Sequence, residues 1–439
     1  LVVPGALFCC VRGQRDDGHD HAAHAVERGA VALLCERPLD LDVPQVVVPD
    51  SRVQMGRAAA AFHGHPSRAI DVVGVTGTNG KTTTTALLQA VLEGAGRPTG
   101  VIGTLSGALT TPDSPELQAR LAAFRHEGVT AVAMEVSSHA LVLHRVEGCT
   151  FAVAVFTNLS RDHLDFHASM EDYFAAKARL FDPGRSAVAV VNADDPHGRL
   201  LADAARIRTV RYGLDDVTGL EVGVRASTGT WRGQRLVVPL GGVFNVSNAL
   251  AAATAAAELG IEPADIVGGL AEAGGVPGRF EVVELGAPFS VVVDYAHTPD
   301  GLDKVLEAAR GVAGAEPART IVVFGCGGDR DRAKRPTMGE VAARLSDLVV
   351  LTSDNPRSED PDAIVAEIRS GVRGPGVVEV EADRRTAIAW ALAEATEGDV
   401  VVVAGKGHET TQVLGDRALP FDDRVVVAEE WARLSAGRR

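Results

Sequence analysis

The stretch DVVGVTGTNGKTTTT, residues 71–85, constrains the fold of this chain more than any other. A β-branched apolar run enters a glycine-rich turn, and a helix is expected from Lys81, which is the setting of a phosphate-binding loop. The spacing departs from the usual G-x-x-x-x-G-K-[ST], because Val75 occupies the position of its first glycine. The segment predicts either a nucleotide site of a particular kind or a structural strand–helix turn. Gly-Lys-Thr-Thr in this setting favours the nucleotide site, with Lys81 reaching the β/γ-phosphates and the Thr82 hydroxyl binding Mg²⁺.

The size and charge of the chain narrow the possible classes of protein. Its 439 residues exceed one ordinary core, so two or three domains are expected. Apolar residues make up 46% and charged residues 23%, as in soluble globular proteins. The formal net charge of −15 argues against a general nucleic-acid or membrane-surface binder, because polyanions are repelled. No apolar run approaches the roughly 20 residues of a membrane helix.

The opening residues and the cysteines predict a cytoplasmic protein. The start LVVPGALFCC does not resemble a secretory signal, and its missing Met indicates a start lost to processing or truncation. The five cysteines are odd in number and contain no C-x-x-C pair, which is typical of free thiols in a reducing compartment.

Three blocks follow one another without an internal repeat. Residues 1–67 alternate a helix at 21–28 with short β-like runs at 7–11, 32–35 and 46–48. Residues 68–275 carry buried-strand runs at 71–77, 130–136, 151–158 and 186–192. Residues 276–439 repeat the alternation with runs at 289–295, 320–325, 347–354 and 399–405. This pattern predicts an α/β protein of three domains: a small N-terminal one, a central mostly parallel P-loop-type sheet with helices on both faces, and a Rossmann-like C-terminal one.

Polar residues gather where these runs end, which is where open α/β sheets bind ligands. Glu135 lies at the end of an expected strand in AMEVSSHALVLHR and is either a magnesium ligand or a satisfied strand-end carboxylate. The segment TNLSRDHLDFH is either a metal cluster or a helix-capping turn; its candidate ligands are Asp162, His163, Asp165 and His167. In the third block, FGCGGDRDRAKRP lacks the third glycine of a dinucleotide fingerprint. It holds a local group of cations, either an anion site or a solvated turn: Arg330, Arg332, Lys334 and Arg335.

Lys177 stands on the apolar face of a predicted helix. Ser169 and Asp172 form a capping box, so the helix begins there. The i±3 and i±4 neighbours of Lys177 are aromatic or aliphatic, and a lysine in that position is costly unless it is paired, modified or extended to the surface.

Two further loops and one histidine group complete the candidates. In TSDNPRSEDP, Pro356 favours an extended Asn355, and the Arg357 guanidinium suits a carboxylate. VAGKGHE places Lys406, His408 and Glu409 after another run. His19, His21 and His24 lie close together, but they lack a cysteine partner and have the spacing of a solvated helix face, so zinc is not expected.

Together these motifs resemble the Mur ligase family, the ATP-dependent amide-forming enzymes of peptidoglycan synthesis. The family's loop G-T-x-G-K-[ST] matches residues 77–82, which answers the question of spacing. The likeness runs through nearly the whole chain in order: PGALFCCVRGQRDDGHD, GTNGKTT, TTPDS, MEVSSHAL, TNLSRDHLDFH, YFAAKARLF, GVFNVSNALAA, PGRFE, DYAHTPD, FGCGGDRDRAKRP, DNPR and GKGHE. Within the family it is similar to the branch that adds the third amino acid, and D-N-P-R marks members of that branch that add meso-diaminopimelate.

The resemblance implies a reaction and a set of site residues. ATP would phosphorylate the γ-carboxylate of UDP-N-acetylmuramoyl-L-Ala-D-Glu, and the amine of meso-diaminopimelate would displace phosphate from the acyl phosphate. Implied catalytic residues are Lys81, Lys177 and His163. Implied ATP-binding residues are Gly77, Thr78, Asn79, Gly80, Lys81, Thr82, Thr83, Asn248, Arg279 and Asp294. Implied UDP-substrate residues are Thr110, Thr111, Ser137 and Arg145. Implied amino-acid-binding residues are Arg330, Asp354, Asn355, Pro356, Arg357, Gly405 and Glu409. Implied Mg²⁺ ligands are Thr82, Glu135, His163 and Lys177, the last as a carbamate. A monomer is expected.

The chain departs from the family pattern at three places, one of which is a short segment between Gly103 and Thr110. Leu143 stands where some relatives carry a substrate-contacting glutamine. The Asp-Ser-Arg that helps bind uridine in relatives does not precede PGALF, so a chain beginning here is expected to bind UDP less tightly. Four alternatives stay open: a lysine-adding ligase, opposed by Arg357; a folylpolyglutamate synthase, opposed by the N-terminal block; a non-catalytic relative, opposed by the intact Lys81, Glu135, His163 and Lys177; and a switch GTPase, opposed by the missing N-K-x-D motif.

Overall fold

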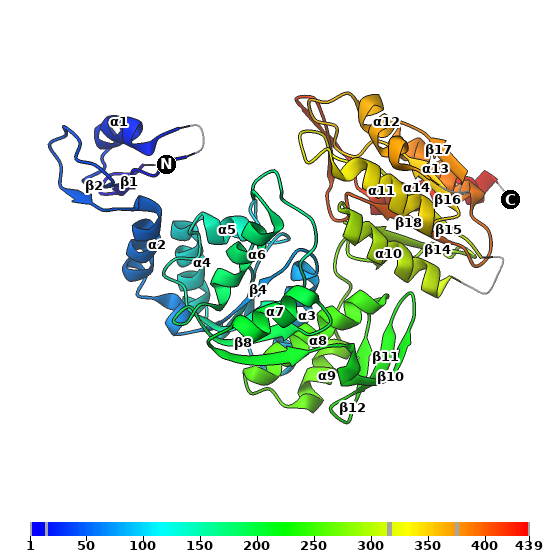
Figure 1. Ribbon diagram of the computed structural model, residues 1–439, viewed down its shortest axis with the longest axis horizontal. Coiled ribbons are helices and arrows are strands. Elements are labelled where there is room, and N and C mark those ends of the chain that lie inside the picture. Colours follow the sequence, from blue (N-terminus) through cyan, green and yellow to red (C-terminus); the bar gives the residue numbers. More distant parts are fainter. Residues whose placement is uncertain (1, 14–15, 314–317, 374–376, 438–439) are drawn as a thin grey trace.

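The computed structural model describes residues 2–13, 16–313, 318–373 and 377–437, which form three lobes in chain order (Figure 1). The N-terminal lobe lies at the upper left, the central lobe at the bottom and the C-terminal lobe at the upper right. The predicted α/β class and three-part layout are confirmed. The domain boundaries predicted after residues 67 and 275 stay predictions.

The N-terminal lobe is a parallel sheet in the order β1-β2-β3. Its elements are β1 (Leu7–Cys9), η1 (Gly18–His21), α1 (Ala22–Glu27), β2 (Ala32–Cys35) and β3 (Gln45–Val47). Helix α2 (Ser51–Phe62) and η2 (Pro66–Arg68) lead into the central lobe. The side chain of Asp50 caps α2 by accepting a hydrogen bond from Val53 N, which is why the helix begins there.

The central lobe is built on a six-stranded parallel sheet in the order β5-β6-β4-β7-β8-β9. The strands are β4 (Asp71–Thr76), β5 (Thr99–Ile102), β6 (Ala131–Glu135), β7 (Phe151–Phe156), β8 (Ser186–Asn192) and β9 (Arg208–Tyr212). Alternate residues of β4 point to opposite faces: Val73 and Val75 join one apolar cluster and Val72 another. Both faces are therefore covered, and the strand runs expected from the sequence are confirmed.

Helices of this lobe divide between the two faces. The first cluster includes α3 (Lys81–Gly94), α8 (Val243–Glu258) and α9 (Pro263–Ala271). The second includes α4 (Ser114–His126), α5 (Ser138–Val142), α6 (Met170–Ala178) and α7 (Pro196–Ala204). Short turns η3 (Arg179–Phe181) and η4 (Leu214–Asp216) complete the lobe, with an antiparallel sheet of β10 (Val217–Val222), β11 (Ser227–Trp231) and β12 (Gln234–Val238).

The C-terminal lobe repeats the design with the strand order β13-β14-β18-β15-β16-β17, parallel except for β13. The strands are β13 (Glu281–Val282), β14 (Ser290–Asp294), β15 (Thr320–Phe324), β16 (Leu348–Leu351), β17 (Val377–Val380) and β18 (Val400–Ala404). One face packs on α10 (Pro299–Val312), α11 (Lys334–Leu345) and α12 (Pro361–Gly371). The other packs on α13 (Arg384–Glu394) and α14 (Asp423–Gly437), and β19 (Thr411–Leu414) pairs with β20 (Arg417–Pro420).

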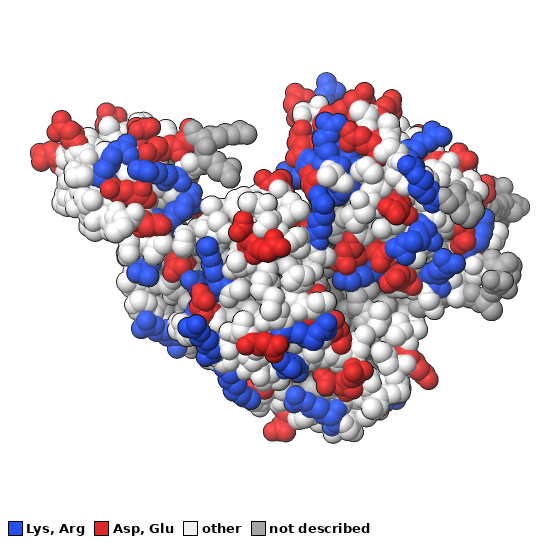
Figure 2. Space-filling view, viewed as in Figure 1, with Lys and Arg blue, Asp and Glu red and all other residues white. Residues whose placement is uncertain are grey.

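The surface reflects this layout. Figure 2 shows a wide hollow between the N-terminal and C-terminal lobes, and Lys and Arg side chains gather on the C-terminal side that borders it. None of the helices in the described ranges is long and apolar enough to cross a bilayer.

Candidate active site between the central and C-terminal lobes

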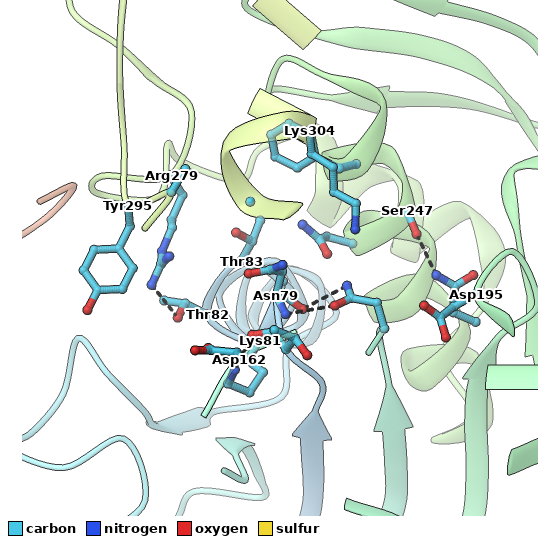
Figure 3. Close-up of a pocket in the computed structure, with 18 of the residues that line it drawn as sticks. Asn79, Lys81, Thr82, Thr83, Asp162, Asp195, Ser247, Arg279, Tyr295 and Lys304 are labelled. Carbon is cyan, nitrogen blue, oxygen red and sulfur yellow. Dashed lines mark hydrogen bonds between the residues drawn. The ribbon is translucent and has the colours of Figure 1, made fainter. Parts of the chain in front are cut away.

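A cavity of about 500 Å³ lies where the carboxyl ends of the central strands meet the C-terminal lobe (Figure 3). Loops that follow β4, β6, β7 and β8 line it from the central lobe. The segments around Arg279 and Tyr295 and the start of α10 line it from the C-terminal lobe. The site is therefore shared between two lobes, at the position where α/β sheets bind ligands.

The predicted phosphate loop connects β4 to α3 and depends on two glycines. Gly77 and Gly80 have φ of +152° and +87°. A Cβ on Gly77 would collide with Thr157 Oγ1, and a Cβ on Gly80 would collide with Asn248 Oδ1. Glycine is thus required at both positions, and the loop lies directly against Asn248. The cavity is lined by the predicted ATP-binding residues Thr78, Asn79, Gly80, Lys81, Thr82, Thr83, Asn248, Arg279 and Asp294.

Two lysines converge on the carbonyl of Gly77, which lies outside the cavity lining. Lys81 Nζ donates to Gly77 O at 3.0 Å and to Thr78 O at 2.8 Å. Lys177 Nζ donates to Gly77 O at 2.7 Å and lies 4.5 Å from the centre of the Tyr173 ring. Lys177 is only 1% exposed, and burial together with the charge on Lys81 lowers its pKa well below the usual value. Its predicted position on an apolar helix face is confirmed.

His163 faces the same cavity in a strained backbone conformation, with φ of +54°. Its backbone N donates to Asp162 Oδ1 at 2.8 Å, and its ring meets the edge of the His139 ring at 4.8 Å. Burial lowers the pKa of His163 to about 4, so the imidazole is neutral near pH 7. Asp165 is exposed and His167 binds Ser138 Oγ at 2.9 Å, so the four polar residues of this segment do not converge.

Glu135 and Thr82 present oxygen atoms near the loop. Glu135 Oε1 accepts from Thr104 N at 2.8 Å, and Thr82 Oγ1 accepts from Arg279 Nη2 at 3.2 Å. Within the described ranges, no group of three or more His, Cys, Asp and Glu is placed to hold a metal ion. Mg²⁺ in nucleotide sites needs only one or two protein oxygen ligands beside the phosphates, so Thr82 and Glu135 fit that ion.

The C-terminal side supplies a cation and a buried carboxylate. Arg279 stacks 4.5 Å from the centre of the Tyr295 ring. Asp294 accepts from Phe280 N at 2.6 Å and from Ala296 N at 2.7 Å, and burial raises its pKa to about 6.

Asp300 is a site residue that the sequence reasoning missed. Its Oδ2 accepts from Asn79 Nδ2 at 2.8 Å and from Lys304 Nζ at 3.0 Å, so it ties the phosphate loop to α10 across the lobes. Asp300 is the last residue of DYAHTPD, at the start of a helix, and that motif was the available signal. Asp300 itself lies outside the cavity lining; unpredicted residues that do line the cavity include Asp195, Ser247, Tyr295, His297 and Lys304.

The four predicted UDP-substrate residues form a connected group beside Glu135. Thr111 Oγ1 donates to Glu135 O at 2.9 Å, Ser137 N donates to Thr111 Oγ1 at 3.1 Å, and Arg145 Nη1 donates to Thr111 O at 3.1 Å. Thr110 and Ser137 line the cavity, whereas Thr111 and Arg145 lie outside its lining.

The predicted amino-acid residues form a second group after β15, β16 and β18, outside the cavity lining. Asn355 Nδ2 donates to Glu409 Oε2 at 2.7 Å, and the Asp354 carboxylate lies over Gly405, whose φ is +114°. Arg357 has φ of +53° and its Nη1 donates to Gly328 O at 2.6 Å. A Cβ on Gly327 would lie 2.9 Å from Arg357 Nη1 and 3.9 Å from Arg330 Cγ, so both arginine side chains pack against this glycine. Pro356 O lies close to Gly328. The Tyr295 and His408 rings, 5.1 Å apart, connect this group to the cavity.

Two of the four predicted cations are paired with carboxylates. Arg335 is fully buried and bonds Glu359 and Glu367, and Arg332 also pairs with Glu367. Lys334 Nζ donates to His297 O at 2.8 Å. Within the described ranges, Arg330 has no carboxylate partner and does not share the contact of Lys334 with His297, so the anion-site interpretation stays a prediction for Arg330.

The N-terminal histidines are separated. His19 is buried, with Nδ1 at 2.5 Å from Asp17 Oδ1 and Nε2 accepting from Glu36 N at 2.9 Å. His21 and His24 are exposed. A core-bonded histidine beside a solvated helix accounts for this spacing.

Comparisons with known proteins agree along the whole chain. Three family descriptions match in order: the Mur ligase family, catalytic domain over residues 1–76, the Mur ligase middle domain over 75–256, and the Mur ligase, glutamate ligase domain over 278–407. The chain is 46% identical to the UDP-N-acetylmuramoyl-L-alanyl-D-glutamate--2,6-diaminopimelate ligase of Geobacillus thermodenitrificans, over 97% of this chain and 92% of that protein. This chain belongs to the Mur ligase family.

Solved Mur ligase structures share its fold. A structure of UDP-N-acetylmuramoyl-L-alanyl-D-glutamate--2,6-diaminopimelate ligase is 34% identical with a TM-score of 0.70, over 99% of this chain and 93% of that one. The MurF ligase of Thermotoga maritima in complex with ADP is 21% identical with a TM-score of 0.67, over 100% of this chain and 96% of that one. The resemblance drawn from the motifs is thereby confirmed for this Mur ligase.

Proposed function

We propose that this Mur ligase belongs to the MurE branch and adds meso-diaminopimelate to the D-Glu γ-carboxylate of UDP-N-acetylmuramoyl-L-Ala-D-Glu, forming ADP and phosphate in peptidoglycan precursor synthesis. The observation that carries the proposal is the shared cavity. It combines a phosphate loop from the central lobe with Arg279 from the C-terminal lobe, and it adjoins the group of Asn355 and Arg357.

The chemistry follows from the substrate. A carboxylate acylates amines poorly, so phosphorylation by ATP gives it a leaving group, and the amine then forms the amide bond as phosphate departs. The loop N–H groups and Lys81 would hold the β/γ-phosphates, and positioning and charge neutralisation are the main tasks of the protein.

Bound Mg²⁺ would neutralise phosphate charge, with Thr82 and Glu135 as its proposed ligands and His163 and Lys177 as a proposed second pair. The side chain of Lys177 must first be modified for that role. Its buried amine is suited to react with CO₂, because a neutral amine forms the N–C bond and releases one proton to give a carbamate. The conversion replaces an amine with oxygen donors, and the burial of Lys177 without an ion-pair partner among the described residues supports it.

Specificity for meso-diaminopimelate would rest on its second carboxylate. The Arg357 guanidinium can donate two parallel hydrogen bonds to a carboxylate. The competing substrate L-lysine lacks this second carboxylate. Arg330, Asp354, Gly405 and Glu409 are proposed to complete the amino-acid site. We further propose that the enzyme acts as a monomer in the cytoplasm, where nucleotide-linked precursors and free thiols are expected.

The proposal is tested by mass spectrometry of the product. Incubation with ATP, Mg²⁺, the UDP-linked dipeptide and meso-diaminopimelate should yield the dipeptide species increased by one diaminopimelate residue. The Lys81→Ala variant should yield none, because phosphate binding is lost. An unchanged dipeptide species with wild-type protein that binds ATP would contradict the proposed function.

A further inference from the structure

Lys406 is a fully buried lysine within the predicted amino-acid site, and none of the roles above uses it. Its ammonium has three N–H donors and three near acceptors. Lys406 Nζ lies 3.1 Å from Asn355 Oδ1, 3.2 Å from Glu409 Oε2 and 2.6 Å from Thr411 O. The donor set is therefore complete, and Lys406 has no free N–H to offer a substrate.

These contacts determine how two neighbouring side chains point. Asn355 Oδ1 accepts from Lys406 and also from Val413 N at 2.9 Å, so its amide nitrogen must face the other way. That nitrogen donates to Glu409 Oε2 at 2.7 Å. Lys406 thus holds the amide and one carboxylate oxygen in one orientation, while Glu409 remains partly exposed and able to meet a ligand.

Lys406 also sets the charge of the site. Two carboxylates lie beside it: Glu409, and Asp354 with Oδ1 at 3.8 Å from Nζ. Asp354 is buried and its Oδ1 has no hydrogen-bond partner among the described residues. With Lys406 present, the trio carries one net negative charge, which suits one substrate ammonium; without Lys406 it would carry two.

We infer that Lys406 is a positioning residue that lets the amino-acid site accept a substrate with a second carboxylate. The inference rests on the proposed function. With the attacking amine neutral, diaminopimelate carries one negative charge more than lysine. Without Lys406, Asp354 and Glu409 repel that extra negative charge more strongly, whereas the same two carboxylates attract the side-chain ammonium of the substrate L-lysine.

The test is the ratio of kcat/KM for meso-diaminopimelate to kcat/KM for L-lysine, measured on Lys406→Met. If the Lys406 ammonium and the second carboxylate of the substrate lie about 8 Å apart in an effective dielectric of about 20, removal of the ammonium changes this ratio by about 30-fold. We expect the ratio to fall at least tenfold from the wild-type value, with the KM for ATP unchanged. Lys406→Arg, which keeps the charge, should retain most of the wild-type ratio. The ratio is independent of the folded fraction of a preparation, so a destabilised variant still answers the question.

The matched control is Arg319→Met, which removes a cation at the opposite end of the same sheet, where Arg319 pairs with Asp399 at 2.9 Å. This control should lose stability without a change in the ratio. If the wild type turns over diaminopimelate and Lys406→Met has the same ratio, the inference is overturned and the proposed function is not. A wild type without diaminopimelate-dependent ADP release would overturn the proposed function and the inference with it.

Discussion

Replacing Lys177 by Met should change how the stability of the central lobe depends on pH. Lys177 is 1% exposed, donates its hydrogen bond to Gly77 O and has no ion-pair partner among the described residues. Burial and the Lys81 charge lower its pKa well below the value of about 10.4 for an exposed lysine. The folded chain therefore holds a neutral amine at pH values where the unfolded chain holds an ammonium.

The sign and size of the effect follow from linkage. Between the folded and unfolded pKa values of Lys177, the unfolded state binds one more proton, so the free energy of unfolding rises with pH. One proton corresponds to about 1.4 kcal/mol per pH unit. Methionine has a similar length and cannot titrate, so Lys177→Met should lose this part of the slope. The two proteins should have the same slope below the folded pKa of Lys177, because there the folded and unfolded states of the wild type both carry the protonated amine.

The assay is urea unfolding at a series of pH values below the unfolded lysine pKa of about 10.4, in CO₂-free buffer without nucleotide. Of the three tryptophans, Trp231 lies in the central lobe, so a Trp390→Phe, Trp431→Phe background reports on that lobe. The wild-type plot of unfolding free energy against pH should be steeper than the Lys177→Met plot by about 1.4 kcal/mol per unit. Parallel plots would refute the conclusion that the buried amine is neutral.

Three further outcomes are expected. Arg357→Ala should lower kcat/KM for diaminopimelate by roughly 100-fold, the effect of losing a charged hydrogen-bonded contact, with little change in the KM for ATP; steady-state kinetics with equal losses for both would refute its specific role. Lys177→Ala should abolish turnover, and formate or acetate should restore part of it by supplying carboxylate oxygens; a fully active variant would remove Lys177 from the mechanism. Glu135→Gln should raise the Mg²⁺ concentration for half-maximal rate at least about tenfold, because a neutral amide binds the ion poorly; an unchanged Mg²⁺ titration would exclude Glu135 as a ligand.

The elements that the sequence predicts well are those with a strong local pattern. Buried parallel strands are continuous apolar runs, so β4, β6, β7 and β8 were expected at almost their observed positions. Helical spacing placed Lys177 on an apolar face but left open whether its amine would extend to the surface, and the structure shows that it is buried. The antiparallel sheet of β10, β11 and β12 was missed because its strands are short and half-exposed. The available sequence signal was Gly233 between two short β-like runs. In the structure Arg232 and Gly233, both at positive φ, form a two-residue hairpin turn between β11 and β12.

The site shows the same limit. The phosphate-loop residues lie together along one cavity, because chain neighbours stay together after folding, whereas the four polar residues of TNLSRDHLDFH do not converge. The hydrogen bond between Asn79 and Asp300 joins residues 221 positions apart, and no local pattern predicts it. Likewise, Arg335 belongs to a cationic motif, but Glu359 and Glu367 on another segment neutralise it. Charge read from sequence alone therefore overstated the basic character of that loop.

The central claim is that this Mur ligase couples ATP cleavage to the addition of diaminopimelate, and ADP release tests it most directly. The assay contains UDP-N-acetylmuramoyl-L-Ala-D-Glu, ATP and Mg²⁺, with meso-diaminopimelate, with L-lysine or with no amino acid. The account predicts that ADP release is much faster with diaminopimelate than with L-lysine, and slowest with no amino acid. Equal release with L-lysine would contradict the role of Arg357, and no amino-acid-dependent release from protein that binds ATP would contradict the proposed reaction.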